Sequence, residues 1–185
     1  MAQPGRLLDL KRTLLVVVDL QQRLVPVIDS HEAVVANCAR LIEGCRVLGV
    51  PVIFSEQYPR GLGPTVEQLR KLAGDDEIAE KITFSCLRDR ALAETVAETG
   101  RDTLLVCGVE AHVCVTQTVL DALEAGYRVH VAADATGSRS PENKRVALER
   151  LAVEGATVTT TESALFELLK KAGTDEFRQI SKLVK

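Results

Sequence analysis

The sequence predicts an α/β fold: a doubly wound, six-stranded parallel sheet of order 3-2-1-4-5-6 with helices on both faces. Strand-like and helix-like segments alternate from one end of the 185-residue chain to the other, which is typical of βα units joined by right-handed crossovers. The strand-like segments are nearly continuous apolar runs, as expected for parallel strands that helices cover on both faces. The length fits one domain, and we expect residues 1–185 to form it.

Six segments have the character of strands. The first, TLLVVVD, is a β-branched run that ends in a carboxylate at Asp19, and the fourth, TLLVCG, is closed by Gly108. The second has Pro51 near its start, where a missing amide donor costs least. The predicted strands cover residues 13–19, 50–55, 78–84, 103–107, 128–133 and 156–160.

Helical spacing of apolar residues follows the strands, and local signals mark the helix ends. Ser30 is expected to cap the first helix, and Ser140 followed by Pro141 marks the start of a later one. The helix after the fourth strand keeps one apolar face from Val113 until Gly126 stops it. The predicted helices cover residues 31–48, 66–72, 88–100, 113–125, 141–154 and 161–168, with a last helical turn or two within 175–183 and a loop at 56–64.

Composition and motifs exclude several classes of function. A net charge of -3 and an aromatic content of 3% provide neither the positive charge nor the stacking surface that nucleic acids require. We expect no membrane contact and a cytoplasmic location, because no segment resembles a signal peptide or a membrane span. No glycine-rich phosphate-binding motif follows a strand, so no nucleotide or other cofactor is expected.

Cys114 is the candidate nucleophile, since it lies in or near the first turn of the helix after the fourth strand. Unpaired amide groups and the positive end of the helix dipole favour a thiolate there. A free cysteine also commonly packs as a small hydrophobic side chain, and this alternative stays open. His112 is not expected to pair with Cys114, because residues two apart on a helix do not face each other. The five cysteines show no CxxC pair and no zinc spacing, which favours reduced thiols.

The predicted sheet order brings a carboxylate to the same crevice. Strands one and four are neighbours in this order, and ligands bind between their carboxyl ends, where the strand order reverses. Asp19 ends the first strand and could take the thiol proton as a general base, or simply cap the loop that follows. Lys81 is a lone cation in a strand-like segment. Most lysines are solvated, but a buried lysine here would stabilise both anions.

Three motifs resemble the isochorismatase-like cysteine hydrolase superfamily: DLQ at residues 19–21, the lysine of EKITFS, and the segment from Gly108 to Ser140. The similarity extends from about residue 13 to residue 168. Within the superfamily the chain most resembles isochorismatase-domain-containing hydrolases of unassigned substrate. The resemblance implies a catalytic triad of Asp19, Lys81 and Cys114 and assembly into a homo-oligomer.

The resemblance also implies a cis peptide bond between Val109 and Glu110. Its implied role is to turn the amides of Glu110 and Cys114 toward a developing oxyanion. The Glu110 carboxylate could bind a substrate amide, or it could be a solvated residue at a helix start. Gln21 and Phe84 are further candidates for binding the substrate, although both could serve only in packing.

One departure from the superfamily narrows the function. Nicotinamidases carry an Asp-x-His metal set after the second strand, whereas this chain reads SEQYPRGLGP there and contains no histidine in that stretch. We therefore expect no metal site. The leading hypothesis is a metal-independent hydrolase of small amides or related carbonyl compounds that works through a thioester on Cys114. The alternative is a binding or scaffolding protein that keeps the fold without turnover.

Overall fold

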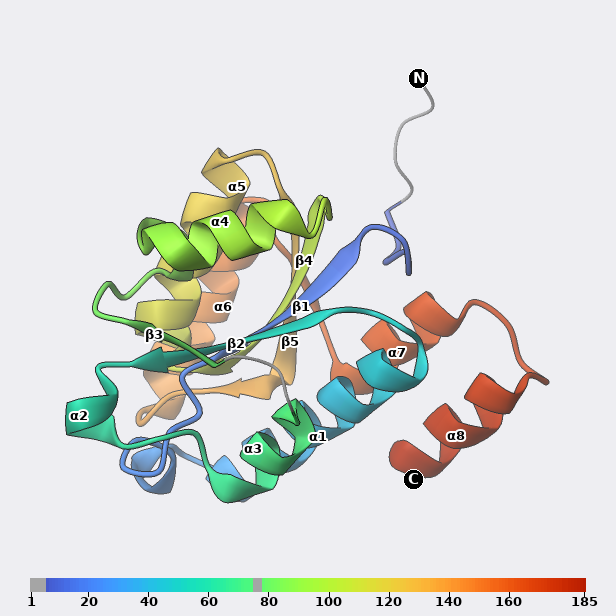
Figure 1. The fold of residues 1–185 in the computed structure, drawn as a ribbon, viewed down its shortest axis with the longest axis horizontal. Helices are drawn as coiled ribbons and strands as arrows, with labels where there is room; N and C mark the ends of the chain where they lie inside the picture. The colour runs from blue at the N-terminus through green and yellow to red at the C-terminus, as the bar shows by residue number, and fades with distance from the viewer. Residues whose placement is uncertain (1–5, 75–77) are drawn as a thin grey trace.

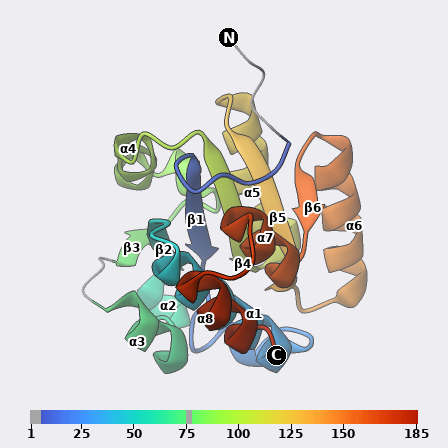
Figure 2. The ribbon, with the colours of Figure 1, turned by 90° about the vertical axis from the view of Figure 1, so that its right-hand side faces the viewer.

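The computed structural model describes residues 6–74 and 78–185. Six parallel strands form one sheet in the order β3-β2-β1-β4-β5-β6 (Figure 1, Figure 2). The strands are β1 (Thr13–Val18), β2 (Val52–Gln57), β3 (Ile78–Lys81), β4 (Thr103–Val109), β5 (Arg128–Gly137) and β6 (Thr157–Thr159). This confirms the predicted doubly wound sheet. The predicted single domain also includes residues 1–5 and 75–77, which lie outside the described part.

Helices cover both faces of the sheet. The helices are α1 (His31–Val47), α2 (Pro59–Leu62), α3 (Glu67–Ala73), α4 (Arg90–Glu98), α5 (Thr116–Glu124), α6 (Pro141–Val153), α7 (Thr161–Leu169) and α8 (Asp175–Leu183). Short 3-10 helices, η1 (Val25–Val27) and η2 (Cys86–Arg88), and a π-helical turn, η3 (Ala111–Val115), complete the fold. In Figure 1, α4, α5 and α6 lie on one side of the sheet and α1, α3, α7 and α8 on the other. None of the described helices is both long and apolar enough to cross a membrane.

The two faces of the sheet build two separate hydrophobic clusters. On β1, Leu15 and Val17 pack toward the α1 side, whereas Leu14 and Val16 pack on the side of α5. All six residues of β1 are buried, because alternate side chains of a strand point to opposite faces and helices cover both. The central strands β1 and β4 are therefore held firmly, and their carboxyl ends lie side by side in the middle of the sheet.

Several element ends differ from the prediction. The third strand stops at Lys81 rather than continuing to residue 84, and the chain turns away so that the side chains of Ile82 and Phe84 are exposed. The second strand extends to Gln57, and the predicted loop after it contains the short helix α2. The fifth strand continues to Gly137, past an irregularity in its pairing with β4.

The predicted helix caps have mixed outcomes. Ser140 accepts a hydrogen bond from the amide of Asn143, as expected for a cap. The prediction that the side chain of Ser30 caps α1 is wrong. The backbone of Ser30 is left-handed, with φ 53°, and its hydroxyl donates to Asp29 instead. The tail forms the complete helix α8, more than the predicted turn or two, because its apolar residue Ile180 packs into the cluster beneath α1.

Candidate active site

The three candidate side chains come from three different strand ends. Asp19 directly follows β1, Lys81 is the last residue of β3, and Cys114 lies in η3 between β4 and α5. Parallel strands end at the same edge of a sheet, so all three face the region where the strand order reverses. They are nearly inaccessible, with relative exposures of 0% for Asp19, 2% for Lys81 and 5% for Cys114.

The Asp19 carboxylate accepts hydrogen bonds from side chains on β2 and β3. Its Oδ2 lies 2.7 Å from Nζ of Lys81, and its Oδ1 accepts a 2.8 Å hydrogen bond from the hydroxyl of Ser55 on β2. The backbone of Asp19 is left-handed, with φ 51°, a conformation that aspartate tolerates better than most residues. This turn directs the carboxylate across the sheet edge, where it meets both partners.

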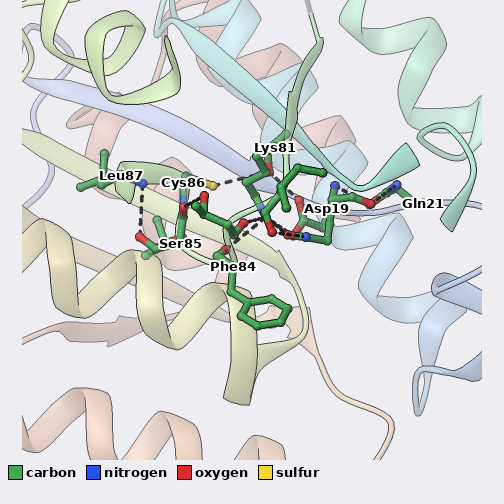
Figure 3. A network of polar contacts seen from close by, with 12 residues as sticks. Asp19, Gln21, Lys81, Phe84, Ser85, Cys86 and Leu87 are labelled. Atoms are coloured by element: carbon green, nitrogen blue, oxygen red, sulfur yellow. Dashed lines mark hydrogen bonds and ion pairs between the residues drawn. The ribbon is translucent and has the colours of Figure 1, made fainter. Parts of the chain in front are cut away.

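The Lys81 ammonium is enclosed by protein oxygen atoms (Figure 3). Besides Asp19, it donates to Oε1 of Gln57 at 2.8 Å, the carbonyl of Phe84 at 3.1 Å and the carbonyl of Thr83 at 3.3 Å. The early end of β3 makes this possible, because the turn after Lys81 aims two backbone carbonyls back at its own side chain. A buried charge is tolerated when it is paired and hydrogen-bonded in this way.

The surroundings of Cys114 favour the protonated thiol over the thiolate. Burial raises the pKa of Cys114, the charge of Asp19 raises it further, and the Lys81 ammonium opposes both effects. The expectation that the helix start favours a thiolate is therefore wrong for the resting site. Desolvation and a nearby anion outweigh the partial charge of the helix end. Any chemistry at this thiol needs a base to remove its proton.

The turn that carries Cys114 begins with a cis peptide bond between Val109 and Glu110. The Glu110 carboxylate accepts hydrogen bonds from both the backbone amide and the guanidinium Nε of Arg139, at 2.9 and 3.1 Å. Its 6% exposure shows that it is not the solvated residue that remained as an alternative. Its contacts tie the start of η3 to the loop after β5.

The remaining candidates differ in their surroundings. Gln21 is fully buried. Its Nε2 donates to the backbone carbonyls of Gln57 and Gly63, and its Oε1 accepts a hydrogen bond from the backbone amide of Gln57. Phe84 is 51% exposed, and its ring points away from the contacts of Lys81 (Figure 3). The nitrogen atoms of His112 contact Ser138 after β5 and Asn143 on α6 rather than Cys114, as expected.

Sequence reasoning missed three polar residues beside the candidate side chains. Ser55 and Gln57, both on β2, contact Asp19 and Lys81 directly, and Cys86 places its sulfur 3.5 Å from the Ser55 hydroxyl. A signal for the first two was present. They are polar residues two apart at the end of a buried strand, so both point to one face of the sheet. All five cysteines are free thiols.

Across residues 6–74 and 78–185, no group of three or more His, Cys, Asp or Glu side chains is arranged so that it could hold a metal ion. The segment after β2 uses Glu56 to accept hydrogen bonds from the amide and hydroxyl of Thr65, at 2.6 and 2.7 Å.

Comparisons with known proteins find similar sequences and similar folds. The chain is 40% identical over 167 residues to isochorismatase domain-containing protein 1 of Danio rerio, covering 90% of this chain but only 59% of that protein. The structure of MAR1 ribonuclease from Caenorhabditis elegans superposes with a TM-score of 0.90 at 33% identity, covering 96% of this chain and 91% of that one. YcaC from Pseudomonas aeruginosa, solved with hexane-2,5-diol and covalent acrylamide, has a TM-score of 0.91 at 26% identity, covering 98% and 93%.

A family model matches most of the chain as well. The model described as the isochorismatase domain matches residues 13–163, a range that includes Asp19, Lys81 and Cys114 and all six strands of the sheet. The chain therefore belongs to the isochorismatase domain family.

Proposed function

We propose that this protein is a cysteine hydrolase of small amides or related carbonyl compounds, with Cys114 as its nucleophile. One observation carries the proposal: the buried carboxylate of Asp19 is paired with a buried ammonium, and its charge helps to raise the pKa of the Cys114 thiol. Because its pKa is raised, the thiol needs a base, and Asp19 is the carboxylate beside it. Membership of the isochorismatase family supports a hydrolase in general terms.

Acylation follows from this arrangement. Asp19 takes the proton of the Cys114 thiol as the sulfur attacks the carbonyl carbon of the substrate. The negative charge that develops on the carbonyl oxygen is received by the backbone amides of Glu110 and Cys114, at the turn with the cis peptide bond. When the tetrahedral intermediate collapses, Asp19 returns the proton to the leaving nitrogen. An amine departs, and the acyl group remains on sulfur as a thioester.

Deacylation repeats the proton transfers with water. Asp19 removes a proton from a water molecule, whose oxygen attacks the thioester carbon at the same oxyanion position. Collapse of this second intermediate breaks the carbon–sulfur bond and releases the carboxylic acid, while Asp19 returns its proton to the sulfur. The net reaction converts an amide and water into an acid and an amine, and it requires neither metal nor cofactor.

The comparisons support a small substrate. YcaC of Pseudomonas aeruginosa carries covalent acrylamide, which is both a small primary amide and an electrophile. The ribonuclease name of the nematode structure belongs to that protein, and this chain has a net charge of -3, which disfavours binding a phosphate backbone.

Assembly and location are proposed alongside the activity. We propose a homo-oligomer in the cytoplasm, with the small-molecule substrate as the other partner. Light scattering coupled to size exclusion tests the assembly, and a mass equal to the 20.1 kDa chain would contradict it.

A panel of small amides and esters tests the activity, with the wild-type protein compared with Cys114→Ala. Turnover should be lost in Cys114→Ala and kept in Cys45→Ala, which also removes a buried thiol but lies in the α1 core. Equal rates for the wild type and Cys114→Ala would reject the hydrolase and favour the binding or scaffolding protein. A short RNA belongs in the panel, because Cys114-dependent cleavage of RNA without amide turnover would also reject the proposal.

A further inference from the structure

The buried ammonium of Lys81 has no exposed surface from which to meet a substrate. Its side chain has a relative exposure of 0%, and four oxygen atoms lie within 3.3 Å of its nitrogen. An ammonium has only three protons to donate, and the two shortest of these contacts are with Asp19 and Gln57. Its protons are therefore committed to the protein.

The orientation of the side-chain amide of Gln57 is set by the hydrogen bond that its nitrogen atom makes. Its Nε2 donates to the carbonyl of Ile82 at 2.7 Å, and a carbonyl can only accept. The amide therefore presents Oε1, its acceptor, to Lys81. Gln57 lies directly opposite Lys81 in the parallel pairing of β2 with β3, which fixes the reach of the side chain.

A second glutamine holds the backbone of Gln57 in place. Oε1 of Gln21 accepts a 2.8 Å hydrogen bond from the backbone amide of Gln57, and Nε2 of Gln21 donates to the backbone carbonyl of Gln57 at 3.0 Å. Gln21 lies two residues after Asp19, so this reciprocal pair ties the segment that carries the carboxylate to the strand that carries Gln57. Asp19, Lys81 and the two glutamines therefore form one connected network.

We propose that Gln57 is a positioning residue that holds the Lys81 ammonium on Asp19, so that Lys81 acts on the reaction through Asp19 and does not bind the substrate. This inference rests on the proposed function for its meaning in turnover. The network itself is defined by contacts that do not depend on the identity of the substrate.

The expected effect on Cys114 has a definite sign. The charged and titratable groups that influence this thiol are Asp19 after β1, Lys81 on β3 and Cys86 in η2. Of these, only the Lys81 ammonium lowers the pKa of Cys114. If Gln57 is lost and the ammonium shifts from its position, the thiol ionises less readily. Simple loosening of the site would instead expose the buried sulfur and make it react faster.

Alkylation of Cys114 by iodoacetamide, followed by mass spectrometry of the modified peptide across several pH values, tests the inference. In Gln57→Met, which keeps the length but removes the acceptor, the rate at a fixed pH should fall about tenfold, the effect of a shift of about one pKa unit. Gln57→Asn keeps the amide but shortens its reach, so it should slow alkylation in the same direction. It serves if Gln57→Met does not fold.

A matched control separates a shift in the position of the Lys81 ammonium from a general loss of stability. Thr161→Val removes a buried hydroxyl at the start of α7 that donates to Asp134 on β5, and it should leave alkylation unchanged. Unchanged or faster alkylation in both Gln57 variants would overturn the inference. Alkylation needs no turnover. A substrate panel without Cys114-dependent hydrolysis would therefore reject the proposed function, whereas the alkylation rates would still decide whether Gln57 positions Lys81. Where turnover is found, the Gln57 variants should lower kcat and leave KM unchanged.

Discussion

Replacing Gly108 with alanine tests the close contact that brings the ends of β1 and β4 together. A Cβ at this position would lie 2.1 Å from the carbonyl oxygen of Val18 and 2.7 Å from its nitrogen. These are backbone atoms of the neighbouring strand, paired with Gly108 in the sheet, so they cannot move aside without disturbing the ladder just before Asp19. The φ of Gly108, 114°, adds a conformational cost.

The expected loss of stability has two parts. A side chain forced into a backbone conformation that favours glycine costs about 1–3 kcal/mol, and overpacking typically costs a further 1–3 kcal/mol. Gly108→Ala should therefore lower the free energy of unfolding by about 2–6 kcal/mol. Gly126→Ala is the matched control, because Gly126 also has a positive φ, 88°, but its new methyl group would have nothing within 4 Å. The control should lose only about 1–2 kcal/mol.

Urea unfolding followed by far-ultraviolet circular dichroism measures both variants, since the chain contains no tryptophan to report by fluorescence. The difference between Gly108→Ala and Gly126→Ala isolates the contact with Val18. Losses that agree within about 0.5 kcal/mol, the usual scatter of neutral substitutions, would refute the argument that the strand contact requires glycine.

Three other buried contacts give predictions of their own. Asp19→Asn leaves the Lys81 ammonium buried without a counter-ion and should cost about 3–5 kcal/mol of unfolding free energy. Adding Lys81→Met should recover part of this loss. If the losses of the two single variants simply add in the double variant, the two side chains do not stabilise each other. Burial raises the pKa of Cys45, so the folded protein keeps a proton that the unfolded chain releases above about pH 8.5. The free energy of unfolding should therefore fall above that pH, less steeply in Cys45→Ala, and an equal slope in both would contradict the reasoning. Thr118→Val removes the acceptor of a buried amide in η2 and should cost about 1–3 kcal/mol, whereas exposed Thr95→Val should change stability by less than about 0.5 kcal/mol; similar losses in chemical denaturation would count against the role of that hydrogen bond.

The sheet order was predictable because its signals are local. A β-branched run such as TLLVVV cannot leave either face in water, so it predicts a central strand of a parallel sheet. Alternation with helices then restricts the connections to right-handed crossovers. The ends of the elements were less predictable. The segment after Lys81 has apolar residues that suit a strand, but in the fold its carbonyls turn back to bind the ammonium.

Part of the candidate site was also within reach of sequence reasoning. Asp19 and Cys114 follow neighbouring strands, so topology predicts that they share a crevice. The residues that organise this crevice were not predicted: Ser55 and Gln57 are common polar residues, and their importance depends on which strand lies beside them. Side-chain partners separated by 24 and 36 positions are decided by register, which no local pattern records.

The sequence by itself determined the class of fold, the order of the strands and the expectation that Asp19 and Cys114 share one crevice, because apolar periodicity and chain connectivity are properties of the linear chain. Only the tertiary structure decided the state of that site. The pKa of Cys114, which the helix start alone would lower, is instead raised, since burial and a carboxylate from another strand outweigh the local helix end. The lone Lys81 became an enclosed ammonium for the same reason: charge interactions depend on distance in space, and the fold brings Asp19 within 2.7 Å.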